Sequence, residues 1–183
     1  EFQFLKVHAG DPDAWKINEE GVLVCAGQGG GWIGTKEGNY GDYHLKLEFN
    51  VPKEGNSGVY IRRPAQGDGA YSGMEIQVID NDAKHWGKLQ DWQMTGSIYR
   101  EVSPAKDAFA EAGAWQTMEV IADKNLIEIY LNGVCIVDVD LDEYETSKSK
   151  AAPLKERPRE GYIGFQNYDG HIKYRNVRIK RLD

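Results

Sequence analysis

Short segments in which apolar and polar residues alternate recur along the whole chain, and they constrain its fold more than any other feature. The clearest runs from Tyr43 to Phe49, where every second side chain is apolar and would face one side of a strand. About nine or ten such segments, separated by many of the 21 glycines, predict two packed antiparallel sheets. We therefore expect an all-β sandwich, most simply a jelly roll.

Two local patterns refine this picture. Leu126–Leu131 and Val134–Val139 flank Asn132-Gly133, a pair that supplies the positive φ angles of a type I′ turn, so they predict a β-hairpin. In the last strand, 171–181, the alternation slips in phase near Arg175-Asn176, which indicates a β-bulge.

Length and charge narrow the class of protein. The 183 residues are enough for one domain with a sizeable core, and we expect a single domain over residues 1–183. The net charge of −7, without a basic stripe, argues against a nucleic-acid partner. No apolar run is long enough to span a membrane. No signal peptide precedes Glu1, but one could have been removed, so the compartment stays open.

The segment at about 80–113 has no clear period. Connections of this length are uncommon in compact domains and are usually functional or disordered, and its aromatic residues argue against disorder. We expect a folded excursion over the concave polar face of the sandwich, with Thr95–Tyr99 returning to the sheet. Trp86, Trp92 and Tyr99 are its candidate contributions to a binding site.

Two further segments, Val59–Arg62 and Met74–Ile79, alternate in the same way. Their polar side chains, opposite the apolar stripes, are Tyr60, Arg62, Glu75 and Gln77. If the two strands share a sheet, this polar face is a binding surface. An ordinary solvated outer face explains the alternation equally well.

Carboxyl groups on this face would suit glycoside chemistry, which needs a proton donor together with a nucleophile or base. Glu75-Ile-Gln-Val-Ile-Asp80 is similar to the Glu-x-Asp-x-x-Glu of laminarinase-type jelly-roll glycosidases, but departs from it at two of three positions. Asp80 reaches the face of Glu75 only if a bulge intervenes. The motif alone therefore does not imply that family's retaining mechanism.

The sequence predicts no cofactor. The four histidines have no metal-ligand spacing. Asp80, Asp82 and Asp91 are scattered oxygen donors that leave open a structural calcium ion. Cys25 and Cys135 both lie in apolar strand-like runs, which favours two small buried side chains and leaves a single disulfide open.

A set of ordered motifs covers nearly the whole chain: Gly21-Val-Leu-Val-Cys, Gly30-Gly-Trp-Ile-Gly-Thr, Tyr40-Gly-Asp-Tyr, Leu47-Glu-Phe, Gly55-Asn-Ser-Gly-Val-Tyr-Ile-Arg, Gly73-Met-Glu-Ile-Gln-Val-Ile-Asp, Thr95-Gly-Ser-Ile-Tyr, Trp115-Gln-Thr, Leu131-Asn-Gly, Gly161-Tyr-Ile-Gly-Phe-Gln and Arg175-Asn-Val-Arg-Ile-Lys. Together they resemble the bacterial 3-keto-disaccharide hydrolase family. The resemblance implies a concanavalin-like jelly roll, commonly exported to the periplasm or cell surface, that acts on glycosides oxidised at C3. Where the family pattern often has Gln-Asp-His, this chain has Gln166-Asn167-Tyr168.

On this basis we expect a glycoside-cleaving enzyme whose substrate is an oligosaccharide or glycoside. Glu75 is the candidate base or acid and Arg62 the candidate charge stabiliser; in a variant mechanism Glu75 and Asp80 hydrolyse the bond directly. The candidate substrate ligands are Asn56, Tyr60, Gln77, Gln166, Trp32, Trp86, Trp92 and Tyr99. Trp32 could instead cover the core.

The alternative function is a carbohydrate-binding module or lectin-like domain, because this fold hosts both enzymes and binders. A scaffold domain of a larger exported complex is a third reading. A deep cleft with a desolvated Glu75 would favour an enzyme. A shallow aromatic platform would favour a binding module.

Overall fold

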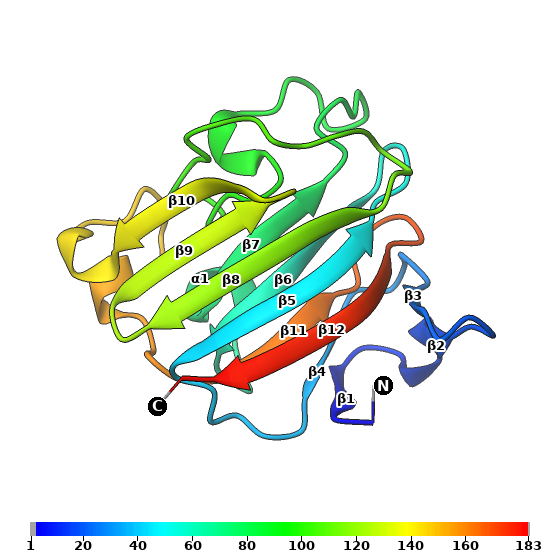
Figure 1. Ribbon diagram of the computed structural model, residues 1–183, viewed down its shortest axis with the longest axis horizontal. Coiled ribbons are helices and arrows are strands. Elements are labelled where there is room, and N and C mark those ends of the chain that lie inside the picture. Colours follow the sequence, from blue (N-terminus) through cyan, green and yellow to red (C-terminus); the bar gives the residue numbers. More distant parts are fainter. Residues whose placement is uncertain (1–2, 183) are drawn as a thin grey trace.

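The computed structural model describes residues 3–182 and consists of two antiparallel sheets packed face to face (Figure 1). The five-stranded sheet has the order β1 (Leu5–Ala9), β4 (Trp32–Thr35), β11 (Tyr162–Gln166), β6 (Asn56–Arg63) and β7 (Met74–Ile79). The seven-stranded sheet has the order β10 (Val134–Asp140), β9 (Leu126–Leu131), β8 (Gln116–Asp123), β5 (Tyr43–Asn50), β12 (Lys173–Arg181), β3 (Leu23–Cys25) and β2 (Trp15–Ile17). The predicted two-sheet jelly roll is confirmed.

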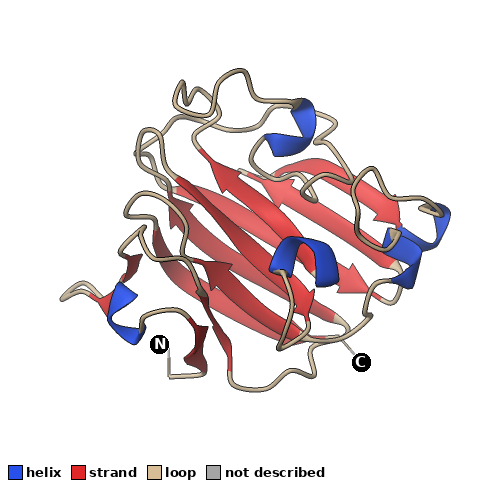
Figure 2. Ribbon diagram, turned by 180° about the vertical axis from the view of Figure 1, so that it is seen from behind, coloured by secondary structure: helices blue, strands red, loops and turns tan. Residues whose placement is uncertain are grey.

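Helices are few and short. They are α1 (Gly69–Ser72) and the 3₁₀ turns η1 (Pro12–Ala14), η2 (Asp91–Gln93), η3 (Leu141–Glu143) and η4 (Leu154–Glu156). Seen from behind, α1 lies in front of the five-stranded sheet (Figure 2). Within residues 3–182, no helix is long and apolar enough to cross a membrane.

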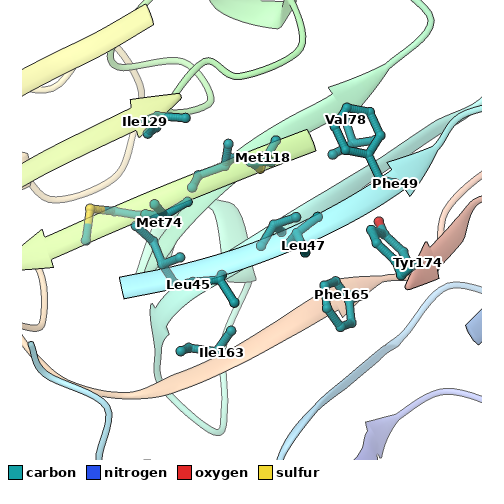
Figure 3. Close-up of a cluster of buried hydrophobic side chains, with 14 of the residues drawn as sticks. Leu45, Leu47, Phe49, Met74, Val78, Met118, Ile129, Ile163, Phe165 and Tyr174 are labelled. Carbon is teal, nitrogen blue, oxygen red and sulfur yellow. The ribbon is translucent and has the colours of Figure 1, made fainter. Parts of the chain in front are cut away.

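The core is built from the apolar stripes that the alternation predicts. Leu45, Leu47 and Phe49 of β5 face inward and are almost fully buried (Figure 3). Met74 and Val78 of β7 come from the opposite sheet and are also fully buried. Because these inward side chains fill the space between the sheets, the alternate residues of β7 must face outward.

Both local patterns are present as predicted. Asn132 and Gly133 have φ angles of 51° and 79°, and the turn brings Val134 opposite Leu131. In β12 the register shifts between Arg175 and Arg178, and Asn176 between them has a φ of 53°. The phase slip in the sequence therefore marks a real bulge.

The two cysteines are free thiols. Cys25 is fully buried in β3, and this burial raises the pKa of its thiol. Cys135 is half-buried in β10, at the opposite end of the seven-stranded sheet. The disulfide that the sequence left open is therefore absent.

The long excursion leaves the end of β7 and returns along the free edge of that strand. The Gln77 N–H donates to the Ser97 carbonyl at 3.0 Å, and the Gly96 N–H donates to the Gln77 carbonyl at 2.9 Å. The Tyr99 N–H donates to the Glu75 carbonyl at 2.8 Å. These bonds cover a sheet edge that would otherwise be unpaired, and they place Tyr99 beside Glu75.

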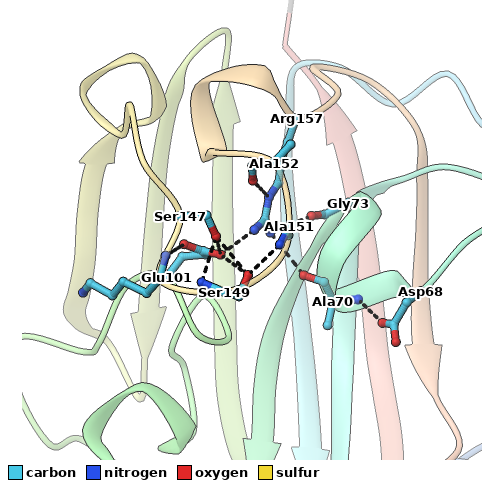
Figure 4. Close-up of polar contacts among 10 residues, drawn as sticks. Asp68, Ala70, Gly73, Glu101, Ser147, Ser149, Ala151, Ala152 and Arg157 are labelled. Carbon is cyan, nitrogen blue, oxygen red and sulfur yellow. Dashed lines mark hydrogen bonds and ion pairs between the residues drawn. The ribbon is translucent and has the colours of Figure 1, made fainter.

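A buried ion pair between Arg157 and Glu101 joins three loops (Figure 4). Arg157 also donates hydrogen bonds to the backbone carbonyls of Ala70, Gly73 and Ala152. A buried charge is tolerated only when it is paired and hydrogen-bonded, so Arg157 must keep these partners. The ion pair and its hydrogen bonds therefore hold the α1 segment against the excursion and the loop before β11.

Candidate active site

A cavity of ≈ 330 Å³ opens on the outer face of the five-stranded sheet. Its walls are built by β6, β7, the end of β11, the α1 segment and the excursion. The lining residues are Asn56, Asp68, Ala70, Tyr71, Glu75, Gln77, Ile79, Trp86, Gln93, Tyr99, Gln166 and Tyr168. Its size is at the lower end of the range for small-ligand pockets, and polar groups converge on it.

Glu75 stands at the centre of this face, in the middle of β7, and only 4% of it is exposed. Burial raises the pKa of its carboxyl group to about 8. The negative charge of Asp68 raises it further, and the positive charge of Arg63 partly opposes this. At neutral pH the group therefore holds its proton and can act as a proton donor.

The space for this carboxyl group exists because position 58 has no side chain. A Cβ on Gly58 would lie 2.1 Å from Oε1 of Glu75 and 2.6 Å from its Cγ, which is closer than atoms can approach. The register places Tyr60 directly opposite Glu75 and Gly58 opposite Gln77. Glu75 therefore leans over Gly58, its diagonal neighbour on the adjoining strand.

Amide side chains from three strands surround Glu75 on the same face. Gln77 Nε2 donates to Asn56 Oδ1 at 3.3 Å, and Gln166 Nε2 donates to the Tyr60 hydroxyl at 2.9 Å. Asn56, Gln77 and Gln166 line the cavity, as the sequence predicted. Tyr60 lies beneath the lining, and its burial raises the pKa of the hydroxyl, so the group keeps its proton.

Asp68 is a second carboxyl group in the cavity, and the sequence analysis missed it. Its side chain accepts a hydrogen bond from the Ala70 N–H at 2.9 Å and thereby caps α1. Gly69 follows it, and a Cβ there would lie 2.3 Å from the Tyr60 ring, so the backbone approaches the sheet closely. An Asp directly before a helix is a capping signal that can be recognised in a sequence. Here the capped helix is a short turn inside a loop, so the signal was not recognised.

The prediction that Arg62 shares this face with Glu75 is wrong. Arg62 has a φ of 48°, and the pairing of β6 with β11 shifts register at this point. Its fully buried guanidinium donates to the Gly41 carbonyl at 3.0 Å and the Lys124 carbonyl at 2.7 Å, and pairs with Asp42 at 3.3 Å. A bulge thus redirects Arg62 into a structural role.

Arg63 and Trp32 form a stacked layer next to the site. The Arg63 guanidinium lies 4.0 Å from the Trp32 ring centre and 5.1 Å from that of Tyr60. Trp32 also stacks on His8 at 4.1 Å and is only 3% exposed. Trp32 therefore packs between His8 and Arg63, and it belongs neither to the cavity lining nor to the core cluster. Arg63, which the sequence analysis did not select, is the cation whose charge acts on Glu75.

Asp80 does not line the cavity. Its carboxylate accepts hydrogen bonds from the Glu54 N–H at 2.9 Å and the Asp82 N–H at 3.1 Å, which ties the start of the excursion to the turn before β6. Nothing in the described part of the chain groups three or more His, Cys, Asp or Glu side chains in a metal-binding arrangement.

Aromatic side chains of the excursion contribute unequally. Trp86 and Tyr99 line the cavity, whereas Trp92 packs edge-on against Tyr99 at 5.4 Å, outside the lining. Opposite Trp86, at 5.7 Å, lies Tyr168, which is 50% exposed and was not selected from the sequence. Trp86 and Tyr168 thus form an aromatic rim at one end of the cavity.

The chain resembles carbohydrate-active proteins over almost its full length. The family model for 3-keto-alpha-glucoside-1,2-lyase-like domains matches residues 7–180. A 3-keto-disaccharide hydrolase of Bacteroides thetaiotaomicron is 26% identical over 94% of this chain and 71% of that protein. A protein of Parabacteroides distasonis, provisionally described as a glycosyl hydrolase, has a TM-score of 0.86 at 25% identity, covering 98% of this chain and 94% of its own.

A more distant neighbour bears only on the fold. The carbohydrate-binding module CBM66 of Bacillus subtilis has a TM-score of 0.61 at 14% identity, covering 97% of this chain and 95% of that one. The same sandwich thus occurs in a protein named as a binding module, so the fold does not choose between the two functions.

Substituting alanine at Gly58 should displace the Glu75 carboxyl group and destabilise the protein by about 1–3 kcal/mol, the usual cost of overpacking. In a Glu75→Ala background the cost should be smaller, because the atoms that the new Cβ would meet are gone. Urea unfolding of the four proteins of this double-mutant cycle measures the coupling. Gly41→Ala is the matched control, since its nearest neighbour would be 3.5 Å away. Equal costs in both backgrounds would argue against the close contact.

The raised pKa of Glu75 makes stability depend on pH. The folded state, with a pKa of about 8 against 4.5 for an unperturbed Glu, binds this proton more tightly than the unfolded state. The stabilisation that this tighter proton binding gives the folded state is complete below about pH 4.5, and it is lost as the pH rises to about 8. Glu75→Gln removes this loss, so its stability relative to wild type should rise by about 1.4 kcal/mol per pH unit across that window. Urea unfolding at a series of pH values tests this; parallel profiles would refute the shift.

Proposed function

The chain belongs to the family of 3-keto-alpha-glucoside-1,2-lyase-like domains, as its sequence motifs predicted, and we propose that it cleaves glycosides oxidised at C3. The observation that carries this proposal is the pairing of two carboxyl groups with different environments in one cavity. Glu75 is buried and holds its proton, whereas Asp68 is exposed and carries a charge that acts on Glu75. Such divergence assigns acid and base roles.

The chemistry follows from the ketone. A carbonyl at C3 acidifies the hydrogen on C2, so a base can remove it and form an enolate. The electron pair then forms the C1–C2 double bond, the bond from C1 to the leaving oxygen breaks, and an acid gives that oxygen a proton. Addition of water across the double bond, with hydroxide at C1 and a proton at C2, completes a net hydrolysis.

In this scheme Asp68 removes the C2 proton and later returns it, and Glu75 protonates the leaving oxygen. Water restores the proton to Glu75 when its hydroxide adds to C1. The amide groups of Asn56, Gln77 and Gln166 bind sugar hydroxyls or the C3 oxygen, where hydrogen-bond donors stabilise the developing negative charge. These three amides take the charge-stabilising role that the sequence suggested for Arg62, because Arg62 is buried away from the cavity.

Direct hydrolysis by two carboxyl groups, the variant mechanism, would need Asp68 rather than Asp80 as the partner of Glu75. A purely binding function is the second candidate, and the aromatic rim of Trp86 and Tyr168 suits it. A desolvated, protonated carboxyl group inside a cavity favours the enzyme, since sugar binding alone does not require it.

We further propose that the protein is exported to the periplasm or cell surface, as the family resemblance implies. Fractionation of the source cells with an antibody against the chain tests this. Recovery in the cytoplasmic fraction alone would contradict it.

Glu75→Gln and Asp68→Asn should each lower kcat/KM for a 3-keto disaccharide by about 10²–10⁴-fold, the usual contribution of a proton-transfer group. In the wild type kcat/KM should fall above about pH 8, where Glu75 loses its proton. The assay is release of the reducing sugar, with thermal melting as a check on folding. Glu145→Gln, in an exposed ion pair with Lys155, is the matched control and should leave turnover unchanged.

Full activity in a folded Glu75→Gln variant would show that this residue only binds or packs. A wild type that binds sugars without cleaving any 3-keto glycoside would favour the binding module.

A further inference from the structure

A second cavity, of ≈ 420 Å³, adjoins the candidate active site. Its lining consists of Tyr71, Arg100, Ser149, Lys150 and Ala151, and we call it the basic cavity. Tyr71 also lines the active-site cavity, so this one side chain is a wall of both. A ligand that passes Tyr71 could occupy both cavities at once.

Both cations of the basic cavity lack an acidic partner. Within residues 3–182, no carboxylate lies within ion-pair distance of Arg100 or Lys150. Nε of Arg100 is buried and has no hydrogen-bond partner, while the guanidinium lies 4.9 Å from the Trp92 ring centre and 5.7 Å from that of Tyr99. Two unpaired cations in one cavity stand out in a chain with a net charge of −7.

Hydrogen bonds hold the rest of the cavity in place, but they do not neutralise the charges of Arg100 and Lys150. Ser149 Oγ donates to Oε1 of Glu101 at 3.0 Å, and the Ser149 N–H donates to Ser147 Oγ at 3.0 Å (Figure 4). The charge of Glu101 is already paired with buried Arg157. The network therefore fixes the loop that carries Lys150, but it leaves the cavity positively charged.

We propose that the basic cavity binds an anionic group, a carboxylate, sulfate or phosphate, on the sugar unit next to the oxidised ring. Arg100 offers a planar donor fork and Lys150 a mobile point charge, the two usual partners of such groups. The proposal deepens the proposed function and rests on it: the oxidised ring lies at Glu75, and the acidic unit extends past Tyr71. The preferred substrates are then acidic glycosides.

The test compares matched 3-keto disaccharides whose second unit is glucose, glucuronate, glucose 6-sulfate or glucose 6-phosphate. Calorimetry with Glu75→Gln gives affinities without turnover, and reducing-sugar release with the wild type gives kcat/KM. We expect at least one acidic compound to be preferred about tenfold over the neutral one, with the preference weakening as salt increases. The ranking of the three acids identifies the anionic group.

Lys150→Gln and Arg100→Gln, made in both backgrounds, should each reduce the ratio of acidic to neutral binding severalfold. Lys148→Gln removes the same charge from the same loop but lines neither cavity, so it should leave the ratio unchanged. Thermal melting checks that each variant is folded. Lys150 is exposed, so its substitution should leave the fold intact.

The outcomes separate the two proposals. Two results would overturn the proposal for the basic cavity and leave the proposed function standing. In the first, the neutral compound is turned over and no acidic compound is preferred. In the second, Lys148→Gln reduces the acidic preference as much as Lys150→Gln does. Tighter, Lys150-dependent binding of an acidic compound without turnover of any compound supports the basic cavity and overturns the proposed function.

Discussion

The burial of the Glu75 carboxyl group is the constraint around which the rest of the site is arranged. A charged carboxylate at this position would lose its hydration without gaining an ion pair, so the group keeps its proton instead. Its place exists only because Gly58 has no side chain, and its backbone is held by β6 on one side and by the returning excursion on the other. A strand thus presents a proton donor with little freedom to move.

The walls around this group come from loops, and loops need separate support. The buried pair of Arg157 and Glu101 supplies it by linking the α1 segment, the excursion and the loop before β11 in one hydrogen-bonded cluster. Asp68 and Tyr71 reach the cavity from the first of these segments, and Tyr99 from the second. The arrangement places a second carboxyl group near Glu75 while leaving it exposed to solvent, so the two groups have different environments.

The sequence predicted the sandwich and half of the site, for a physical reason. Wherever alternation continues unbroken, as in β7, it places each side chain on the correct face, and Glu75 and Gln77 were found this way. The bulge in β6 breaks the alternation between two adjacent arginines, so the pattern could not tell Arg62 from Arg63. In β12 the phase slip was visible because apolar residues lie on both sides of it. Asp68 was missed because its position depends on tertiary packing of a loop rather than on a period.

The most direct test of this account is the titration of the Glu75 carboxyl carbon by ¹³C NMR in protein labelled on glutamate, with the signal assigned by its loss in Glu75→Gln. The account predicts a single transition at about pH 8, well above those of the exposed glutamates. A transition near the unperturbed value of 4.5 would show that Glu75 is charged at neutral pH, and it would contradict the role of this residue as the proton donor.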